Sequence, residues 1–268
     1  MKIGNKNFEI GKRTYIMGIL NITPDSFSDG GKYNNIQAAI NHAKIMISNG
    51  ADIIDIGGES TRPGHSFVSI DEEIKRVIPI IEALRKELSV PISVDTYKGR
   101  VAEIALKAGA DMINDIWGFK KDTDIARVAA NYNVPCCLMH NRNNRNYNNL
   151  IEDILKDLEE SIAIALNAGV KKENIIIDPG IGFAKKYEDN LKTINNLEKL
   201  NNLGYPILLG TSRKSMLGFA QGLDASERLE GTLATTTIGI MKGCSFIRVH
   251  DIKENKRVCV LTDAIFRS

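Results

Sequence analysis

The stretch CSFIRVHD, residues 244–251, has the pattern of a buried β-strand that ends in two side chains able to carry positive charge. Arg248 and His250 are two residues apart, so in a strand both side chains leave the same face. A buried strand needs a reason to end in such groups. Whatever these two side chains face must come from the other strands of the chain.

Short apolar runs alternate with longer amphipathic runs along the chain, which is the pattern of repeated βα units and a parallel sheet. Eight runs fit strands: TYIMGIL, DIIDIG, PISVD, DMINDI, VPCCLMH, NIIIDP, PILLG and FIRVH. Helical patterns between them include residues 36–50, 71–88 and 150–169. This order predicts an α/β fold, a (β/α)₈ TIM barrel. A doubly wound open sheet also fits, but the segment after the first strand, ILNITPDSFSDGG, lacks the glycine pattern GxGxxG.

The chain has 268 residues and 43% hydrophobic content, enough for one large core. We therefore expect a single domain over residues 1–268, with no length left for a fused second domain. The first dozen residues contain two brief strand-like pieces around Gly4 and Gly11. They predict a short N-terminal hairpin that closes the bottom of the barrel.

Composition excludes several classes of partner. The formal net charge is only +2 and both signs are mixed throughout, so neither nucleic acid nor a membrane surface is expected. Apolar runs break well before 18 residues and the start lacks a signal-peptide pattern, so a cytoplasmic protein is expected. The four cysteines have no metal-site spacing and are expected to be buried, reduced thiols.

Polar residues stand where the strands end, and in barrels of this kind the catalytic groups lie at that end. Each alone could cap a helix or a turn, but together they favour one rim around a concave site. The set comprises Asn21, Glu59, Thr61, Arg62, Asp95, Asn114, Asp115, His140, Asp178, Ser212, Arg213, Lys214, Arg248 and His250.

One part of this rim is cationic. Arg248 and His250, with Arg62 from the segment GGESTRPG, match the oxygens of a phosphate or diphosphate. Asn21 offers a hard oxygen ligand that could place Mg²⁺ against that phosphate. The alternative interpretation is that Arg248 pairs with a neighbouring carboxylate and His250 is a structural rim residue.

The other part is acidic. Asp95, Asn114 and Asp178 follow strands, and a carboxylate deep in a barrel needs a partner. That partner is either Lys214 or a ligand edge rich in N–H donors, such as an aminopyrimidine. No serine or cysteine stands beside a histidine in a nucleophile motif, so covalent catalysis is disfavoured. A donor-rich ring at one end and a diphosphate at the other suit transfer of a group away from a diphosphate leaving group.

Two segments are rich in Gly, Pro, Ser and Asp: residues 21–35 and 57–69. Loops of this length in a barrel are often lids or binding loops, although each could be a plain surface loop. Both follow early strands, which places them over the same rim.

Eight motifs in one order give the chain a specific resemblance: MGILNITPDSFSDGG, DIIDIGGESTRPG, SVDT, MINDI, CLMHNR, IIIDPGIGF, GTSRKSMLG and IRVHD. From about residue 14 to the C-terminus, the chain resembles the dihydropteroate synthase family. The resemblance implies a (β/α)₈ enzyme of folate biosynthesis. Such an enzyme joins 6-hydroxymethyl-7,8-dihydropterin diphosphate to 4-aminobenzoate and releases diphosphate.

The resemblance also implies roles for residues at matching positions. The pterin positions fall on Asp95, Asn114, Met139, Asp178, Phe183 and Lys214. The diphosphate positions fall on Asn21, Arg62, Arg248 and His250, with Asn21 also a ligand of Mg²⁺. The aminobenzoate pocket is expected from Phe27, Thr61, Pro63, Phe183, Lys214 and Ser215. Among these, Asp95, Lys214 and Arg248 are expected to be catalytic.

An SN1-like course is also implied, in which the C–O bond breaks first and leaves a delocalised cation on the pterin methylene. Carboxylates near the ring then favour the cation, while Mg²⁺ and the cationic residues stabilise the diphosphate. The two loops would exclude water that could capture the cation. Sulfonamides are expected to compete with aminobenzoate, and a homodimer through helices of the C-terminal third is expected.

After His140 the chain departs from one common form of the family, because NRNNRNYNN replaces a continuation containing Gly and Gln. This change puts only the loop after the fifth strand in doubt. Two other functions compete: a corrinoid-type pterin methyltransferase and a non-catalytic pterin-binding barrel. The first would not need Arg62, Arg248 and His250, and the second could lose Asp25, Phe27 and Arg62, yet all are present.

Overall fold

The computed structural model describes residues 1–22, 31–59, 67–219 and 221–267. Its centre is a closed barrel of parallel strands in the order β10-β3-β4-β5-β6-β7-β8-β9. The strands are β3 (Tyr15–Asn21), β4 (Ile53–Gly57), β5 (Ile92–Asp95), β6 (Met112–Asp115), β7 (Cys136–Met139), β8 (Ile175–Asp178), β9 (Ile207–Leu209) and β10 (Cys244–Val249). The predicted (β/α)₈ barrel and all eight predicted strands are confirmed.

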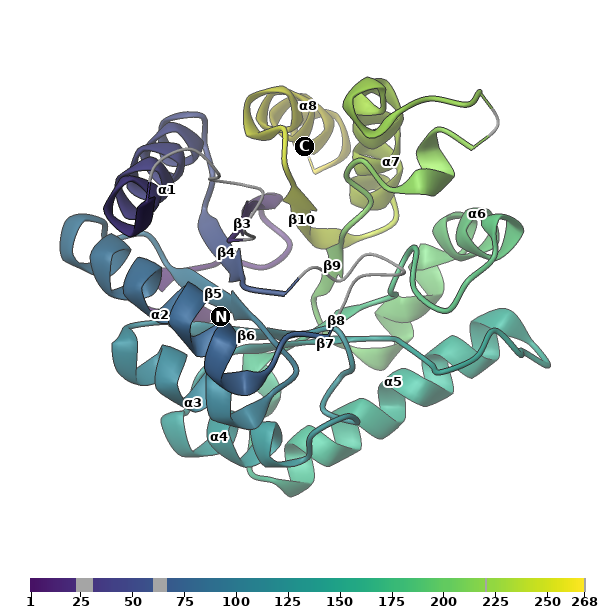
Figure 1. Ribbon diagram of the computed structural model, residues 1–268. Helices are drawn as coiled ribbons and strands as arrows, with labels where there is room; N and C mark the ends of the chain where they lie inside the picture. Colours follow the sequence, from purple (N-terminus) through teal and green to yellow (C-terminus); the bar gives the residue numbers. More distant parts are fainter. Residues whose placement is uncertain (23–30, 60–66, 220, 268) are drawn as a thin grey trace.

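Helices form a ring around these strands (Figure 1). They are α1 (Gly31–Ser48), α2 (Ile70–Glu87), α3 (Gly99–Ala108), α4 (Asp124–Tyr132), α5 (Leu150–Asn167), α6 (Tyr187–Asn195), α7 (Leu229–Met241) and α8 (Ile252–Phe266). Short 3₁₀ helices cover Lys172–Asn174, Leu197–Leu203, Ser215–Leu217 and Ala225–Glu227. Among the described residues, no helix is both long enough and apolar enough to cross a membrane.

Helix α2 illustrates why these segments fold as they do. Ser69 lies before its first turn, and the side-chain oxygen accepts a hydrogen bond from the backbone N–H of Glu72. Val77, Ile81 and Leu84 then bury one stripe against the sheet, at the three- and four-residue spacing of a helix face.

The interior of the barrel is built in two layers, because side chains two residues apart on a strand share a face. The lower layer is apolar and consists of Tyr15, Met17, Ile53, Met112, Cys137, Ile176, Leu208 and Phe246. Two residues further along these strands come polar groups, among them Asp55, Asn114, Asp178 and Arg248. The alternation therefore places an apolar floor beneath a polar upper layer.

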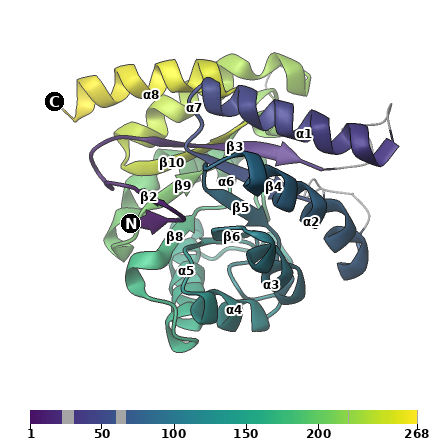
Figure 2. The ribbon, with the colours of Figure 1, turned by 90° about the vertical axis from the view of Figure 1, so that its left-hand side faces the viewer.

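A short antiparallel hairpin, β1 (Lys2–Ile3) and β2 (Lys6–Asn7), closes the lower end of the barrel. Figure 2 shows it at the end opposite to the tip of the β3 arrow. Ile3 and Phe8 pack into the apolar layer, and the predicted hairpin at the bottom of the barrel is confirmed. The two strands flank a turn at Gly4 and Asn5, which the Gly4 φ of +57° permits, whereas Gly11 lies beyond the hairpin. The predicted strand piece around Gly11 is thus wrong.

Strand register brings the upper ends of neighbouring strands to one level. Asn21 pairs with Gly57, Gly57 with Asp95, and Asp95 with Asn114. Across the barrel, Met139 pairs with Asp178. The ends of the strands therefore form one rim, where the site residues gather.

Candidate active site

Arg248 occupies the centre of the polar layer and is held by two carboxylates. Its Nε donates to Asp55 Oδ2 at 2.6 Å and its Nη2 donates to Asp95 Oδ2 at 2.6 Å. The side chain of Asp55 is fully buried and that of Asp95 is nearly so, whereas the Arg248 side chain stays 20% exposed. One edge of the guanidinium is therefore bound by the two carboxylates, and the rest of the side chain can be reached by solvent or a ligand.

Asp55 also fixes the orientation of Asn114, whose Nδ2 donates to Asp55 Oδ2 at 3.1 Å. The second carboxylate oxygens, Asp55 Oδ1 and Asp95 Oδ1, are buried and have no hydrogen-bond partner among the residues that the structure describes. A buried acceptor without a donor costs free energy, so such atoms mark places where a donor is expected. A ring with several N–H groups would supply those donors.

Burial sets the charge state of these groups. It raises the pKa of Asp95 to about 7, with Arg248 opposing the rise and Asp55 adding to it. For Arg248, burial alone would lower the pKa, but the Asp55 and Asp95 carboxylates raise it above its ordinary value. The guanidinium is therefore a permanent cation, and Asp95 can change charge near neutral pH.

Asp178 and Lys214 form the next part of the rim. Asp178 Oδ1 accepts a hydrogen bond from the backbone N–H of Gly180 at 2.6 Å, and burial raises the pKa of this carboxyl. A Cβ placed on Gly210 would lie 3.8 Å from Arg248 Cβ and 3.9 Å from Asp178 Oδ2. Glycine here leaves room between the arginine and the carboxylate.

Lys214 Nζ donates to the carbonyl oxygen of Ile181 and lies 4.6 Å from the centre of the Phe183 ring. Burial lowers the pKa of Lys214 to about 8, with Asp178 opposing the shift. The direct hydrogen bond goes to the Ile181 carbonyl, so this lysine is fixed beside Phe183.

His250 lies at the end of β10 and contacts Ser212. Its Nδ1 is 3.0 Å from Ser212 Oγ, and its backbone N–H donates to the same oxygen at 3.1 Å. Asn21, at the end of β3, is exposed at the rim, as is Ser215 after β9. These side chains are open to a ligand, whereas Met139 is buried in β7.

Four residues predicted at the rim have structural partners instead, and one of them, Arg213, binds the Asp251 carboxylate. Asp115 accepts hydrogen bonds from the backbone N–H groups of Trp117 and Phe119, which fixes the turn after β6. Glu59 Oε2 accepts from the ammonium of Lys98 at 2.5 Å. His140 is fully buried and contacts two charged side chains described below. The prediction of a polar end on each strand therefore included residues that hold the loops.

Four predicted site residues, Phe27, Thr61, Arg62 and Pro63, lie outside the described residues, as does Asp25. Residues 23–30 and 60–66 of the two proposed lid loops lie there too, whereas residues 31–35, predicted as loop, form the start of α1. These predictions stay predictions.

Two residues near the site were missed from the sequence. Asp55 interrupts the apolar run of β4, two residues from Ile53 in the apolar layer, so it shares the inward face. Strand alternation could have found it. Lys185 is buried behind the β8 loop, and no spacing rule distinguishes it from its exposed neighbour Lys186.

The described residues contain no group of three or more His, Cys, Asp or Glu side chains able to hold a metal ion. Asn21 contributes one amide oxygen at the rim. Mg²⁺ keeps several waters and is often held jointly by a protein oxygen and substrate phosphates. The rim thus fits a Mg²⁺ shared with a diphosphate, and not a closed protein cage.

Comparison with known proteins agrees over the whole barrel. The family described as pterin binding enzyme matches residues 17–250. The dihydropteroate synthase of Clostridium beijerinckii is 67% identical over 268 residues, which is 100% of both chains.

Solved structures are equally similar. The dihydropteroate synthase of Clostridium difficile, determined in the presence of pteroic acid, superposes with a TM-score of 0.96 at 55% identity, over 98% of this chain and 100% of that one. The Xanthomonas albilineans enzyme with 4-aminobenzoic acid gives a TM-score of 0.90 at 38% identity, over 95% of this chain and 94% of that one.

Proposed function

The chain belongs to the dihydropteroate synthase family of pterin-binding enzymes, and we propose that it joins 6-hydroxymethyl-7,8-dihydropterin diphosphate to 4-aminobenzoate. The products are 7,8-dihydropteroate and diphosphate, which makes the enzyme a transferase of folate biosynthesis. The observation that carries this proposal is a pair of buried carboxylate oxygens beside Arg248, Asp55 Oδ1 and Asp95 Oδ1, to which none of the described residues donates a hydrogen bond.

The acidic side of the site binds the pterin in this proposal. Asp95, Asn114 and Asp178 offer acceptors to the N–H groups of the ring, and Lys214 offers a donor to a ring acceptor. Met139 and Phe183 supply apolar surface beside it. Because the three polar groups lie on adjoining or facing strands of a rigid barrel, the ring needs little reorganisation of the protein to bind.

Arg248, His250, Asn21 and Arg62 are proposed to hold the diphosphate. Arg248 is 20% exposed and always charged, so it can stabilise the negative charge that develops on the leaving group. Mg²⁺, when bound at Asn21 and the diphosphate, would neutralise further charge on those oxygens. We propose this ion as the cofactor.

Breakage of the C–O bond transfers its electron pair to the diphosphate and leaves a cation delocalised over the pterin methylene and ring. Asp95, ionised above about pH 7, lies where it can stabilise that cation. The amine nitrogen of 4-aminobenzoate then attacks the methylene and loses its proton afterwards, so no strong base is needed. The segments at residues 22–30 and 58–69, which follow β3 and β4, are proposed to exclude water during this step.

The aminobenzoate pocket is proposed to be formed by Phe27, Thr61, Pro63, Phe183, Lys214 and Ser215. The Lys214 ammonium lies over the Phe183 ring. An aromatic carboxylate beside this pair could pack its ring against Phe183 and direct its carboxylate toward the ammonium. Sulfonamides share the aromatic amine and an acidic group with aminobenzoate. We therefore propose that they compete for this pocket.

We propose further that residues 1–268 act as one domain in a cytoplasmic homodimer. Exposed apolar side chains on α7 and α8, including Met241, Leu261 and Ile265, supply a surface for a second copy. Figures 1 and 2 show these helices side by side. Cys136, Cys137, Cys244 and Cys259 are free and buried, which suits a reducing compartment.

Product identification tests the proposed reaction. Purified protein with both substrates and Mg²⁺ should form 7,8-dihydropteroate, identified by mass spectrometry. Asp178→Asn should lower the rate on the order of a hundred-fold, since one ring contact loses its charge. The exposed Asp124→Asn on α4 is the matched control. No dihydropteroate from the wild-type protein, despite measurable pterin binding, would favour a binding protein instead.

A further inference from the structure

Lys185 is a buried lysine that the proposed reaction does not use. It follows β8 and is 4% exposed, whereas the next residue, Lys186, is exposed. Burial lowers the pKa of Lys185 to about 7, with the carboxylate of Asp178 opposing the shift. Burying an ammonium group costs free energy unless it is paired and hydrogen-bonded. An apolar side chain would fill this space at lower cost, so the position needs a reason to carry a lysine.

The ammonium of Lys185 has three acceptors, one for each of its N–H bonds. Nζ is 2.8 Å from His140 Nδ1, 3.0 Å from the Gly180 carbonyl oxygen and 3.2 Å from the Phe183 carbonyl oxygen. The two carbonyls belong to the turn at residues 180–184, which we name the Phe183 turn. A neutral lysine would have only two donors for these three acceptors.

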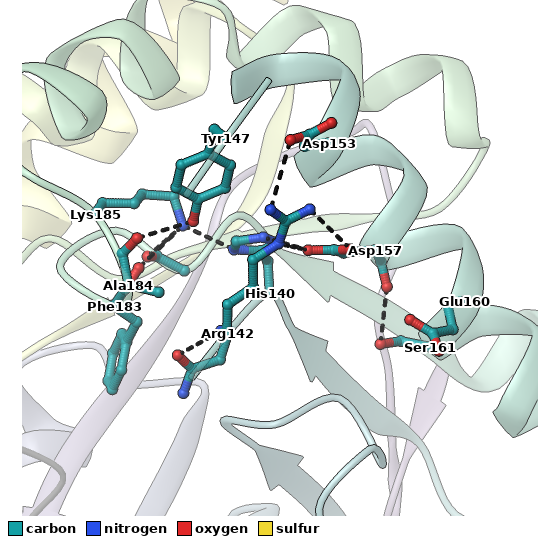
Figure 3. Close-up of polar contacts among 12 residues, drawn as sticks. His140, Arg142, Tyr147, Asp153, Asp157, Glu160, Ser161, Phe183, Ala184 and Lys185 are labelled. Atoms are coloured by element: carbon teal, nitrogen blue, oxygen red, sulfur yellow. Dashed lines mark hydrogen bonds and ion pairs between the residues drawn. The ribbon is translucent and has the colours of Figure 1, made fainter. Parts of the chain in front are cut away.

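His140 is itself held by charged side chains on the side of the ring that faces α5. Its Nε2 is 3.0 Å from Asp157 Oδ2 on α5, and Arg142 binds the same carboxylate. The Asp157 carboxylate can only accept a hydrogen bond, so Nε2–H is the donor and Nδ1 is the acceptor for Lys185. Burial lowers the pKa of His140 to about 4, so the imidazole is neutral at neutral pH. Figure 3 shows the chain of contacts from Asp157 through His140 to Lys185.

The Phe183 turn is also fixed at its other backbone groups. Tyr147 donates through its hydroxyl to the Ala184 carbonyl at 2.9 Å, and Asn190 accepts from the Gly182 N–H at 2.6 Å. On the side of the site, Lys214 donates to the Ile181 carbonyl. In Figure 3 the Phe183 ring points away from Lys185. Lys185 thus holds the turn from behind while Lys214 and Phe183 face the site.

We propose that Lys185 is a positioning residue for the transferase reaction, acting through Phe183. Its ammonium fastens the Phe183 turn to His140 and so fixes the ring that borders the aminobenzoate pocket. This role rests on the proposed function, because it assigns Phe183 to that pocket. Pterin binding depends mainly on Asp95, Asn114 and Asp178, to none of which Lys185 donates a hydrogen bond. Loss of Lys185 should therefore act more on aminobenzoate than on the pterin.

A set of variants tests this role. Lys185→Met removes all three donors, Lys185→Gln keeps two donors for the two carbonyls, and Lys186→Met is the exposed control. We expect Lys185→Met to raise the KM for aminobenzoate on the order of ten-fold, with a smaller change in the pterin Kd. Lys185→Gln should be intermediate and Lys186→Met should match wild type. If Lys185→Met does not fold, the KM for aminobenzoate of Lys185→Gln, compared with that of Lys186→Met, still tests the role of Lys185.

A double-mutant cycle separates positioning from general structural support. If Lys185 acts through Phe183, adding Lys185→Met to Phe183→Ala should change the KM little beyond Phe183→Ala alone. A full additional rise in the double variant, or an unchanged KM in Lys185→Met, would overturn the role of Lys185. A wild-type protein that forms no dihydropteroate would overturn the proposed function itself, which is a different outcome.

Discussion

Arg248 is the residue on which the two halves of the site meet. From the sequence it was assigned to the diphosphate, with pairing to a carboxylate as the alternative. The structure shows two carboxylates, Asp55 and Asp95, bound to its inner edge. The two interpretations are compatible, because the pairing orients a guanidinium that is still 20% exposed toward a ligand. An arginine held in this way needs no reorganisation when charge develops on the leaving group.

Replacement of Arg248 should therefore affect turnover more than pterin binding. We expect Arg248→Ala to lower kcat on the order of a hundred-fold or more, because it removes charge stabilisation from the leaving group. The pterin Kd should change less. Steady-state kinetics and calorimetric titration measure the two effects, with the exposed Arg257→Ala as the control. Equal losses in turnover and pterin binding would contradict a leaving-group role.

Asp95 should make pterin binding depend on pH. Its pKa is raised from 3.8 to about 7, so between these values the folded protein keeps a proton that the unfolded chain has lost. As pH rises through this window, the contribution of Asp95 to the free energy of unfolding therefore falls. The same rise in pH forms the carboxylate that is proposed to accept hydrogen bonds from the pterin ring. Affinity for a non-reactive pterin should rise as pH increases toward about 7.

Calorimetric titration of the wild-type protein and Asp95→Asn at several pH values measures this effect. The variant cannot ionise, so its affinity should vary less with pH. The same pH dependence in both proteins would assign the titration to another group.

At the scale of elements, the strands were the most predictable part. Each has an apolar run bounded by Gly, Pro or polar residues, and the two-residue alternation separates the apolar layer from the polar layer above it. Asp55 was predictable by that rule and was missed. Lys185 was not predictable, because its role depends on His140, which is 45 residues away in sequence. Contacts of that kind exist only after the strands have assembled.

The N-terminal hairpin is the element whose contribution is easiest to isolate. Phe8 is 3% exposed and packs against Tyr15 and Phe246, with ring centres 4.7 and 5.9 Å away. We expect Phe8→Ala to lower the free energy of unfolding by about 3–5 kcal/mol, since it leaves a cavity in the apolar layer. Urea denaturation measures the loss. Phe8 lies at the end of the barrel opposite to the rim, so kcat of the folded variant should stay near wild type. A large fall in kcat would contradict this expectation, because it would show that packing of the apolar layer affects the reaction.

At the scale of the whole molecule, the residues that stabilise the barrel and the residues of the proposed site lie at opposite ends of the strands. The lower layer and hairpin are apolar, whereas the polar groups of the proposed site lie at the opposite ends of the strands. Buried carboxylates and lysines in the upper layer cost stability, and the extensive apolar core beneath and around them offsets that cost. The helices α7 and α8 add an exposed apolar surface outside both layers.

That surface predicts the assembly state. Leu261 and Ile265 on α8 are 64% and 68% exposed. Leu261→Glu with Ile265→Glu should convert the proposed homodimer to a monomer, because charges would be buried without partners in the interface. Sedimentation velocity measures the change, with the exposed Lys253→Glu on the same helix as control. A wild-type protein that is monomeric at micromolar concentration would contradict the proposed dimer.

The stoichiometry of diphosphate release tests the central claim most directly. Diphosphate and dihydropteroate are measured together from the dihydropterin diphosphate and Mg²⁺, with and without 4-aminobenzoate. The account predicts one diphosphate for each dihydropteroate and little release without aminobenzoate, because the two segments after β3 and β4 are proposed to exclude water from the cation. Pterin binding without any release, or rapid release that does not depend on aminobenzoate, would contradict it.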